Sequence, residues 1–177
     1  MFSCLLPPFL PGSAFASRPE LSQLTFHDGR KGEDHYRDGK DRLERWFGHR
    51  LDYGFSEFNS DTYGPIAYKA VVAVAGCAPD AEMRAQARVV MNLQLFDHIL
   101  GSHGAKLATA RGRAYSGGKV DSHIYRHMGL IKGEGRQQDM DKDIGGSESS
   151  HYCLATLHGY RLPEVLLQVA SSLRWPD

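Results

Sequence analysis

Apolar residues recur at helical spacing in two central segments of the chain. Over residues 62–78 they follow the i, i+3, i+4, i+7 pattern of an amphipathic helix: Tyr63, Ile66, Ala67, Ala70, Val71, Val74, Cys77 and Ala78. From about residue 79 to Leu100 they fall on two faces, Met83/Ala87/Val90/Met91 and Val89/Leu93/Phe96/Leu100. Two apolar faces predict a helix enclosed between neighbours. Because only a few residues join the two segments, we expect an antiparallel helical hairpin.

Residues at the ends of these segments predict where the helices begin and end. Pro65 is tolerated in a first turn, where its missing N–H has no helical partner. Pro79 opens the second helix, with Asp80 and Glu82 at the positive end of its dipole. Gly101 is a natural stop for that helix.

Two more helices flank the hairpin. Residues 33–51 carry one apolar stripe on a charged background: Tyr36, Leu43, Trp46, Phe47 and Leu51. Gly39 weakens the first turns of this helix. Pro163 starts a last helix, whose expected buried stripe is Val165, Leu166, Val169, Ala170 and Leu173.

Residues 101–160 form a long, glycine-rich polar region. Eleven glycines fall there, with few apolar runs and many Ser, His, Asp and Arg residues. A loop of this length is uncommon inside a compact domain and is usually functional or disordered. There is room for short strands around residues 122–131. Because strands and helices do not alternate, and strands are too few for a sandwich, the predicted fold class is all-α.

The chain length fits one domain, residues 30–177, preceded by an arm over residues 1–29. Ala14-Phe15-Ala16 resembles a signal-peptide cleavage site. However, no basic residue precedes Arg18, and three prolines break the apolar stretch. We therefore expect an extended apolar arm packed on the domain or on a partner, and we favour a cytoplasmic location over secretion.

Composition narrows the classes of partner. Lys plus Arg and Asp plus Glu each number 21, so the chain has no basic excess for binding nucleic acid. No apolar run approaches the roughly 20 residues that span a bilayer, so no membrane partner is expected. Three widely spaced cysteines form neither a disulfide framework nor a metal knuckle, and Cys77 is expected to be a small buried residue.

Three separated motifs resemble a group of largely uncharacterised bacterial proteins. The motifs are "RLDYGFSEFNSDTYGP" with the hairpin that follows it, "GRAY" at residues 112–115, and "LATLHGYRLPEVLLQVA" at residues 154–170. The group is similar to the α/α-toroid class, which includes alginate- and heparin-type polysaccharide lyases and many glycoside hydrolases. A complete toroid needs more hairpins than this chain holds. The resemblance therefore implies an incomplete α/α toroid, equivalent to a C-terminal section.

The resemblance implies β-elimination on an acidic polysaccharide or oligosaccharide, with no cofactor. This reaction needs a group that neutralises the sugar carboxylate, and a Tyr or His pair that moves protons. Asn59 is the candidate amide, and Arg111 or Arg113 the candidate guanidinium, whose planar fork suits a carboxylate. His103 and Tyr115 are the candidate proton-transfer pair. We expect residues 57–63 and 102–115 to line one surface.

Glu57 and Tyr63 are further candidates for contacting substrate, but each candidate also has a structural interpretation. Glu57 and Asn59 are placed where polar side chains commonly cap a following helix. Tyr63 on an apolar stripe also fits a core residue with a bonded hydroxyl. The loop arginines and His103 also fit solvated surface positions.

Two rival functions stay open at this stage. One is a non-catalytic helical module that docks other helices or forms a homo-oligomer. The other is a metal-dependent hydrolase, because "HIYRH" places His123 and His127 four residues apart, and His151 and His158 follow. The glutamate of an HExxH zinc site is absent and Gly129 disfavours a helix there, so no metal site is assigned.

Overall fold

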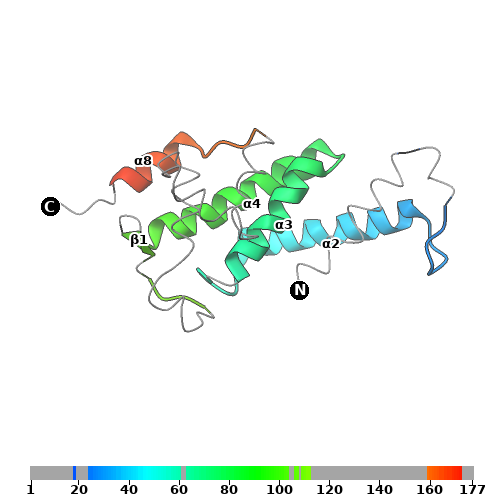
Figure 1. The fold of residues 1–177 in the computed structure, drawn as a ribbon, viewed down its shortest axis with the longest axis horizontal. Helices are drawn as coiled ribbons and strands as arrows, with labels where there is room; N and C mark the ends of the chain where they lie inside the picture. The colour runs from blue at the N-terminus through cyan, green and yellow to red at the C-terminus, as the bar shows by residue number, and fades with distance from the viewer. Residues whose placement is uncertain are drawn as a thin grey trace, which may run out of the picture.

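The structure is a computed structural model that describes residues 18, 24–60, 63–103, 106–107, 109–112 and 159–172. Its elements are α2 (Gly32–Tyr53), α3 (Tyr63–Cys77), α4 (Ala81–Leu100), β1 (Ser102–His103), β2 (Lys106–Leu107) and α8 (Glu164–Ser172) (Figure 1). The two strands hold two residues each and pair antiparallel, so the described part of the chain is all-α, as predicted. The strands expected around 122–131 and most of the expected arm lie outside the described residues.

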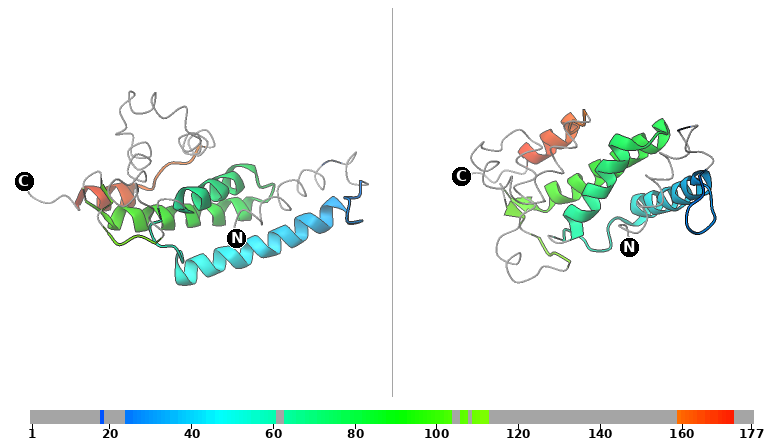
Figure 2. Two further views of the ribbon diagram at one scale, coloured as in Figure 1. Left: turned by 60° about the horizontal axis from the view of Figure 1, so that its bottom comes forward. Right: turned by 45° about the vertical axis from the view of Figure 1, so that its right-hand side comes forward.

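Helix α4 is the central element of the fold. It contacts α3, α2 and α8, which confirms the prediction of a helix enclosed between neighbours. Residues 78–80 join α3 to α4, and the two helices lie side by side as a hairpin in both views of Figure 2. Helix α2 runs along one side of this hairpin and α8 covers α4 on another.

The core is built around α4 along its length, with α2, α3 and the C-terminal segment packed on it. Its members are Leu43, Phe47, Tyr68, Ala70, Val71, Val72, Val74, Ala75, Ala78, Met83, Ala87, Val90, Met91, Leu95, Ile99, Tyr160, Leu162 and Leu166. Tyr160 also donates a hydrogen bond from its hydroxyl to Asn92 Oδ1 at 2.6 Å, which ties residues 159–172 to α4. All four residues of the first predicted face of α4 are buried.

Several predicted buried positions are wrong. Leu51, Ile66, Val89, Leu100 and Val165 are each about half exposed or more, and Cys77 is exposed. In α3 the reason is composition. Alanine and valine occur on all sides of this helix, so the apolar pattern does not show which face packs inward. Of the predicted stripe, Ala70, Val71 and Val74 are buried, and the structure also buries Tyr68, Val72 and Ala75, which the stripe did not include. Leu100 and Val165 lie at helix ends, where neighbouring helices no longer cover them.

Polar caps define the ends of α4. Helix α4 begins at Ala81, two residues after Pro79, and Asp80 Oδ1 accepts a hydrogen bond from Glu82 N at 2.9 Å. The other oxygen of Asp80 pairs with Lys40 of α2, which ties the two helices together. At the far end, Gly101 N donates to Asp97 O at 3.1 Å, as the predicted stop requires.

Candidate functional site

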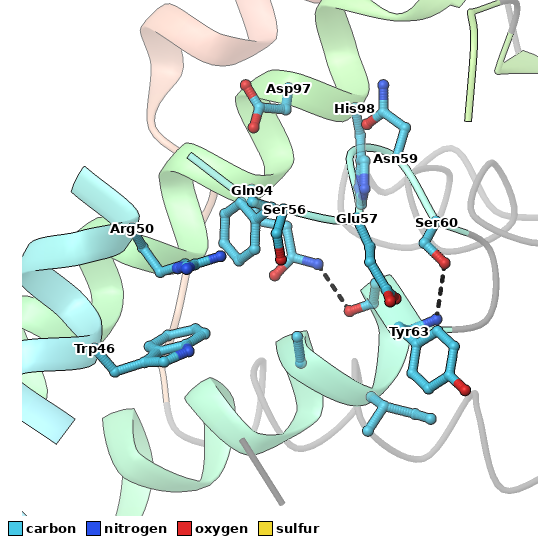
Figure 3. Close-up of a pocket in the computed structure, with 14 residues that line it drawn as sticks. Trp46, Arg50, Ser56, Glu57, Asn59, Ser60, Tyr63, Gln94, Asp97 and His98 are labelled. Carbon is cyan, nitrogen blue, oxygen red and sulfur yellow. Dashed lines mark hydrogen bonds between the residues drawn. The ribbon is translucent and has the colours of Figure 1, made fainter. Parts of the chain in front are cut away.

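A cavity of about 610 Å³ lies where the end of α2, the loop over residues 54–60, the start of α3 and the second half of α4 meet (Figure 3). Its size falls in the range of small-ligand sites. The lining residues are Trp46, Arg50, Phe55, Ser56, Glu57, Asn59, Ser60, Tyr63, Gly64, Ile66, Ala67, Gln94, Asp97 and His98. Arg50 and Trp46 enter from α2 on one side, and Glu57, Asn59, Ser60 and Tyr63 from the loop and α3 on the other.

The loop over residues 54–60 is shaped by two backbone features. Gly54 has φ +68°, a conformation that glycine adopts without strain, and its N–H donates to Arg50 O at 2.9 Å, which closes α2. Ser60 then starts α3, because its Oγ accepts from Tyr63 N at 3.1 Å. Ser60 is therefore the polar side chain bonded at this helix start. Neither polar atom of the Asn59 side chain has a hydrogen-bond partner among the described residues, so the interpretation of Asn59 as a cap of α3 is wrong.

Asn59 is the least satisfied polar residue in this loop. Its φ is +50°, a region that asparagine tolerates better than most residues. The side chain is only 4% exposed, and neither Oδ1 nor Nδ2 has a hydrogen-bond partner in the part of the chain that the structure describes. A buried polar group without a partner costs about 1–3 kcal/mol. Such a group on a cavity wall needs an explanation other than stability.

Gln94 of α4 is half satisfied in the same wall. Its Nε2 donates to Gly64 O in the first turn of α3 at 2.7 Å, which fixes the amide across the hairpin (Figure 3). Its Oε1 is buried and has no partner among the described residues. Five buried side-chain atoms of the described residues lack a hydrogen-bond partner, and four of them belong to residues that line this cavity: Arg50 Nε, Asn59 Oδ1 and Nδ2, and Gln94 Oε1.

Arg50 lies over two aromatic rings. Its guanidinium carbon is 5.3 Å from the centre of the Trp46 ring and 5.8 Å from that of Phe55, and those rings meet edge to face at 6.2 Å. One terminal nitrogen lies 2.8 Å from His49 Nδ1. Burial lowers the pKa of Arg50, yet an arginine stays charged at neutral pH. No ion pair joins it to a carboxylate of the described residues.

The second half of α4 adds an acid and a histidine. Asp97 is half-buried, and burial raises the pKa of its carboxyl. It forms no ion pair within the described residues. His98 is 4% exposed and lies in the last turn of α4, where the helix dipole favours positive charge. The cavity therefore combines a guanidinium, two amides, an imidazole and two carboxyls with aromatic surface.

The structure brings three of the seven predicted site residues to this cavity: Glu57, Asn59 and Tyr63. Tyr63 is 37% exposed, so its interpretation as a core residue is wrong; α3 turns Tyr68 inward instead. Arg111 is half-buried in residues 109–112, beside the cavity loop, but is not a lining residue.

Residues 109–112 pack tightly on the loop. Gly112 N donates to Phe58 O at 2.8 Å, and a Cβ at Gly112 would lie 3.2 Å from the backbone of Glu57. The described part of segment 102–115 thus meets the segment that follows α2. His103 pairs with Lys106 through the backbone of β1 and β2. Arg113, Tyr115 and the four histidines at 123, 127, 151 and 158 lie outside the described residues. Within the described ones, no group of three or more potential metal-binding side chains occurs.

Among the lining residues not predicted as site residues from the sequence, four carry an ionisable or amide side chain: Arg50, Gln94, Asp97 and His98. Gln94, Asp97 and His98 stand at i, i+3 and i+4, so they form one polar stripe in the second half of α4. That stripe was an available indication of a site. Arg50 has no such pattern, because α2 is charged on most of its surface.

Comparison of the chain with protein-family models, with curated protein sequences and with solved structures gives no match. In the described residues, no helix combines the length and the apolar character needed to cross a membrane.

Proposed function

We propose that this cavity binds an acidic saccharide and that the protein is a section of an α/α toroid that cleaves uronic-acid polymers by β-elimination. The observation that carries the proposal is Asn59, whose amide is buried in the cavity wall without a partner among the described residues. Stability gives no reason to keep such a group. A role in binding the carboxylate of a substrate does explain why an unpaired amide is kept at this position.

The composition of the wall favours a sugar. Trp46 and Phe55 offer aromatic surface to the apolar face of a pyranose ring, and Glu57, Ser60 and Gln94 offer oxygens to its hydroxyls. Sugars combine these two kinds of surface in one small molecule. A purely apolar ligand would leave the buried amides unsatisfied, and a purely ionic one would not use the rings.

The reaction makes one double bond and breaks one C–O bond. The Asn59 amide donates to the uronic carboxylate, which stabilises the negative charge that develops there as C5 loses its proton. The C5–H electron pair forms the C4–C5 double bond, the bond from C4 to the glycosidic oxygen breaks, and that oxygen takes up a proton. The Asn59 amide atoms are shielded from water, so the side chain has to rotate toward the ligand.

Two pairs of residues are candidates for the proton transfers. His98 and Tyr63 line the cavity and supply an imidazole and a phenol. His103 and Tyr115 are the pair that the family resemblance indicates. Separate His98→Gln, Tyr63→Phe, His103→Gln and Tyr115→Phe variants distinguish the pairs, because only the acting pair lowers kcat by a large factor.

The test follows absorbance of the unsaturated product with alginate, glucuronan and heparin. Asn59→Asp keeps the shape but repels the carboxylate, and we expect its rate to fall about 100-fold or more. Phe58→Ala, at the exposed neighbour of Asn59, is the matched control and should retain activity. If the folded protein yields no unsaturated product from any uronic polymer, the lyase proposal is wrong.

A second candidate function is a helical docking module without catalysis. The observation that favours it is the set of large exposed apolar side chains on the loop and helices: Leu51, Tyr53, Phe58, Ile66, Val89, Leu100 and Val165. Scattered apolar residues are normal, but a hairpin from an incomplete toroid would need partners. Size-exclusion chromatography over a concentration range tests this candidate, since a docking module with no partner should self-associate.

A further inference from the structure

The cavity also holds a charged group that the β-elimination step does not use. We propose that Arg50, lying over Trp46 and Phe55, binds the carboxylate of the sugar next to the one that reacts, so that the site selects two consecutive uronic acids. The proposal rests on the proposed function, because it assigns a second subsite to the same cavity. Arg50 is a different guanidinium from Arg111 and Arg113, which the sequence offers for the reacting carboxylate.

The surroundings of Arg50 leave it suited to an anion from outside the chain. A guanidinium pairs with a carboxylate through parallel N–H donors along its edge. The rings of Trp46 and Phe55 cover part of its surface, and His49 engages one terminal nitrogen. Nε is buried without a partner, and no described carboxylate forms an ion pair with the group. A half-buried cation with no internal counterion gains most from an anionic ligand.

The two ends of the cavity differ in charge. Arg50 stands on the α2 side, whereas Glu57, Asn59 and Tyr63 stand on the loop and α3 side (Figure 3). A ligand with a single carboxylate at Asn59 would leave Arg50 unused. A ligand with two carboxylates on neighbouring sugars uses both. The cavity volume of about 610 Å³ gives room for a short oligosaccharide rather than one small ion.

Glu57 and Asp97 also line the cavity. Their carboxylates repel an anionic ligand unless the ligand turns its hydroxyls, and not its carboxylates, toward them. Carboxylate oxygens are acceptors, so they suit the hydroxyls of a sugar rather than its carboxylate. Burial raises the pKa of the Asp97 carboxyl. Gln94 Oε1, held by the bond from Nε2 to Gly64 O, is a further acceptor for a hydroxyl. These groups favour one orientation, with the second carboxylate at Arg50.

Binding is measured first, because it does not depend on catalysis. The chain has two tryptophans, Trp46 and Trp175. A Trp175→Phe background leaves Trp46 as the fluorescent reporter beside Arg50. The probes are a saturated diuronic acid and the same disaccharide with the carboxyl of one sugar, then the other, reduced to an alcohol. We expect the diacid to bind most tightly.

Variants at Arg50 then assign the effect. Arg50→Gln should weaken binding of the diacid about 10- to 100-fold. It should also bind the diacid no more tightly than one of the two reduced disaccharides. Arg50→Lys should recover part of the preference for the diacid. Arg45→Gln, on an exposed position of the same helix, is the matched control and should bind as the parent does. The proposal would be overturned if Arg50→Gln still bound the diacid more tightly than both reduced disaccharides. It would also be overturned if the parent bound all three probes equally.

Turnover separates this proposal from the one it rests on. Glucuronan presents consecutive uronic acids, and hyaluronan alternates them with a neutral amino sugar. We expect the parent to prefer glucuronan and Arg50→Gln to lose that preference while it still forms unsaturated product. Product from glucuronan with no effect of Arg50→Gln overturns the subsite and leaves the lyase. Binding that depends on Arg50 without product from any polymer overturns the lyase and leaves the subsite.

Discussion

The two halves of α4 differ in whether the buried polar atoms of the described residues have hydrogen-bond partners. The first half buries Met83, Ala87 and Val90, and its polar groups are bonded: Asp80 caps the first turn, and Arg84 donates to Ala78 O at 2.7 Å and Pro79 O at 2.9 Å. The second half buries Gln94 and His98 beside the cavity and leaves Gln94 Oε1 unpaired among the described residues. Within the described residues, α4 thus has a first half without an unpaired buried polar atom and a second half in which the buried Gln94 Oε1 has no partner.

The largest effect is expected from Met91→Ala at the middle of α4. Met91 is 1% exposed within the core, and removing a buried side chain of this size costs about 2–5 kcal/mol through lost burial and a residual cavity. Urea unfolding followed by circular dichroism measures the change. Val89→Ala, at a half-exposed position of the same helix, is the control and should cost less than about 1 kcal/mol. Equal losses for both variants would contradict the packing described for α4.

A smaller effect is expected from Asp80→Ala, which removes the cap of α4. Loss of a capping carboxylate costs about 0.5–2 kcal/mol, and this variant also loses the pairing with Lys40. The hydrogen bond from Lys40 holds the pKa of Asp80 below its usual value. A lowered folded-state pKa means that this stability is present above about pH 4 and is lost as the pH falls.

Thermal melts across pH test this assignment. The difference between the parent and Asp80→Ala should shrink as the pH falls below about 4. Lys40→Met keeps the cap and removes only the ion pair, so it should cost less than Asp80→Ala. A difference that is constant down to pH 2 would show that the Asp80 carboxylate does not stabilise the fold as described.

The sequence was sufficient for the helices and for one wall of the site. Caps and stops such as Asp80 and Gly101 act within a few residues, so their effect is visible in the sequence. The loop that carries Glu57 and Asn59 could also be predicted, because its polar and aromatic residues exceed what a short connection needs. These predictions depend on local chemistry.

The opposite wall depends on packing between distant segments. Arg50 reaches the cavity only because α2 lies along α4 and Gly54 turns the chain back toward α3. The inner face of α3 was also undetermined, since alanine and valine fit either face. Side-chain interactions between distant segments are also not visible in the sequence. Lys40 and Asp80, for example, are 40 positions apart, so the helical spacing of residues does not predict that they pair.

The smallest effect is expected from Asp97→Asn in the second half, and its direction is opposite to that at Asp80. Burial raises the pKa of the Asp97 carboxyl in the folded state, so the folded protein holds this proton more tightly than the unfolded chain. Its contribution to stability is therefore complete at low pH and declines as the pH rises above about 4. Asp97→Asn removes this decline. Relative to the parent, its melting temperature should be higher at neutral pH than at pH 3, with Asp52→Asn at an exposed position of α2 as the control. A relative melting temperature that falls with pH would mean that Asp97 is stabilised as a carboxylate, and that the second half of α4 is as well satisfied as the first.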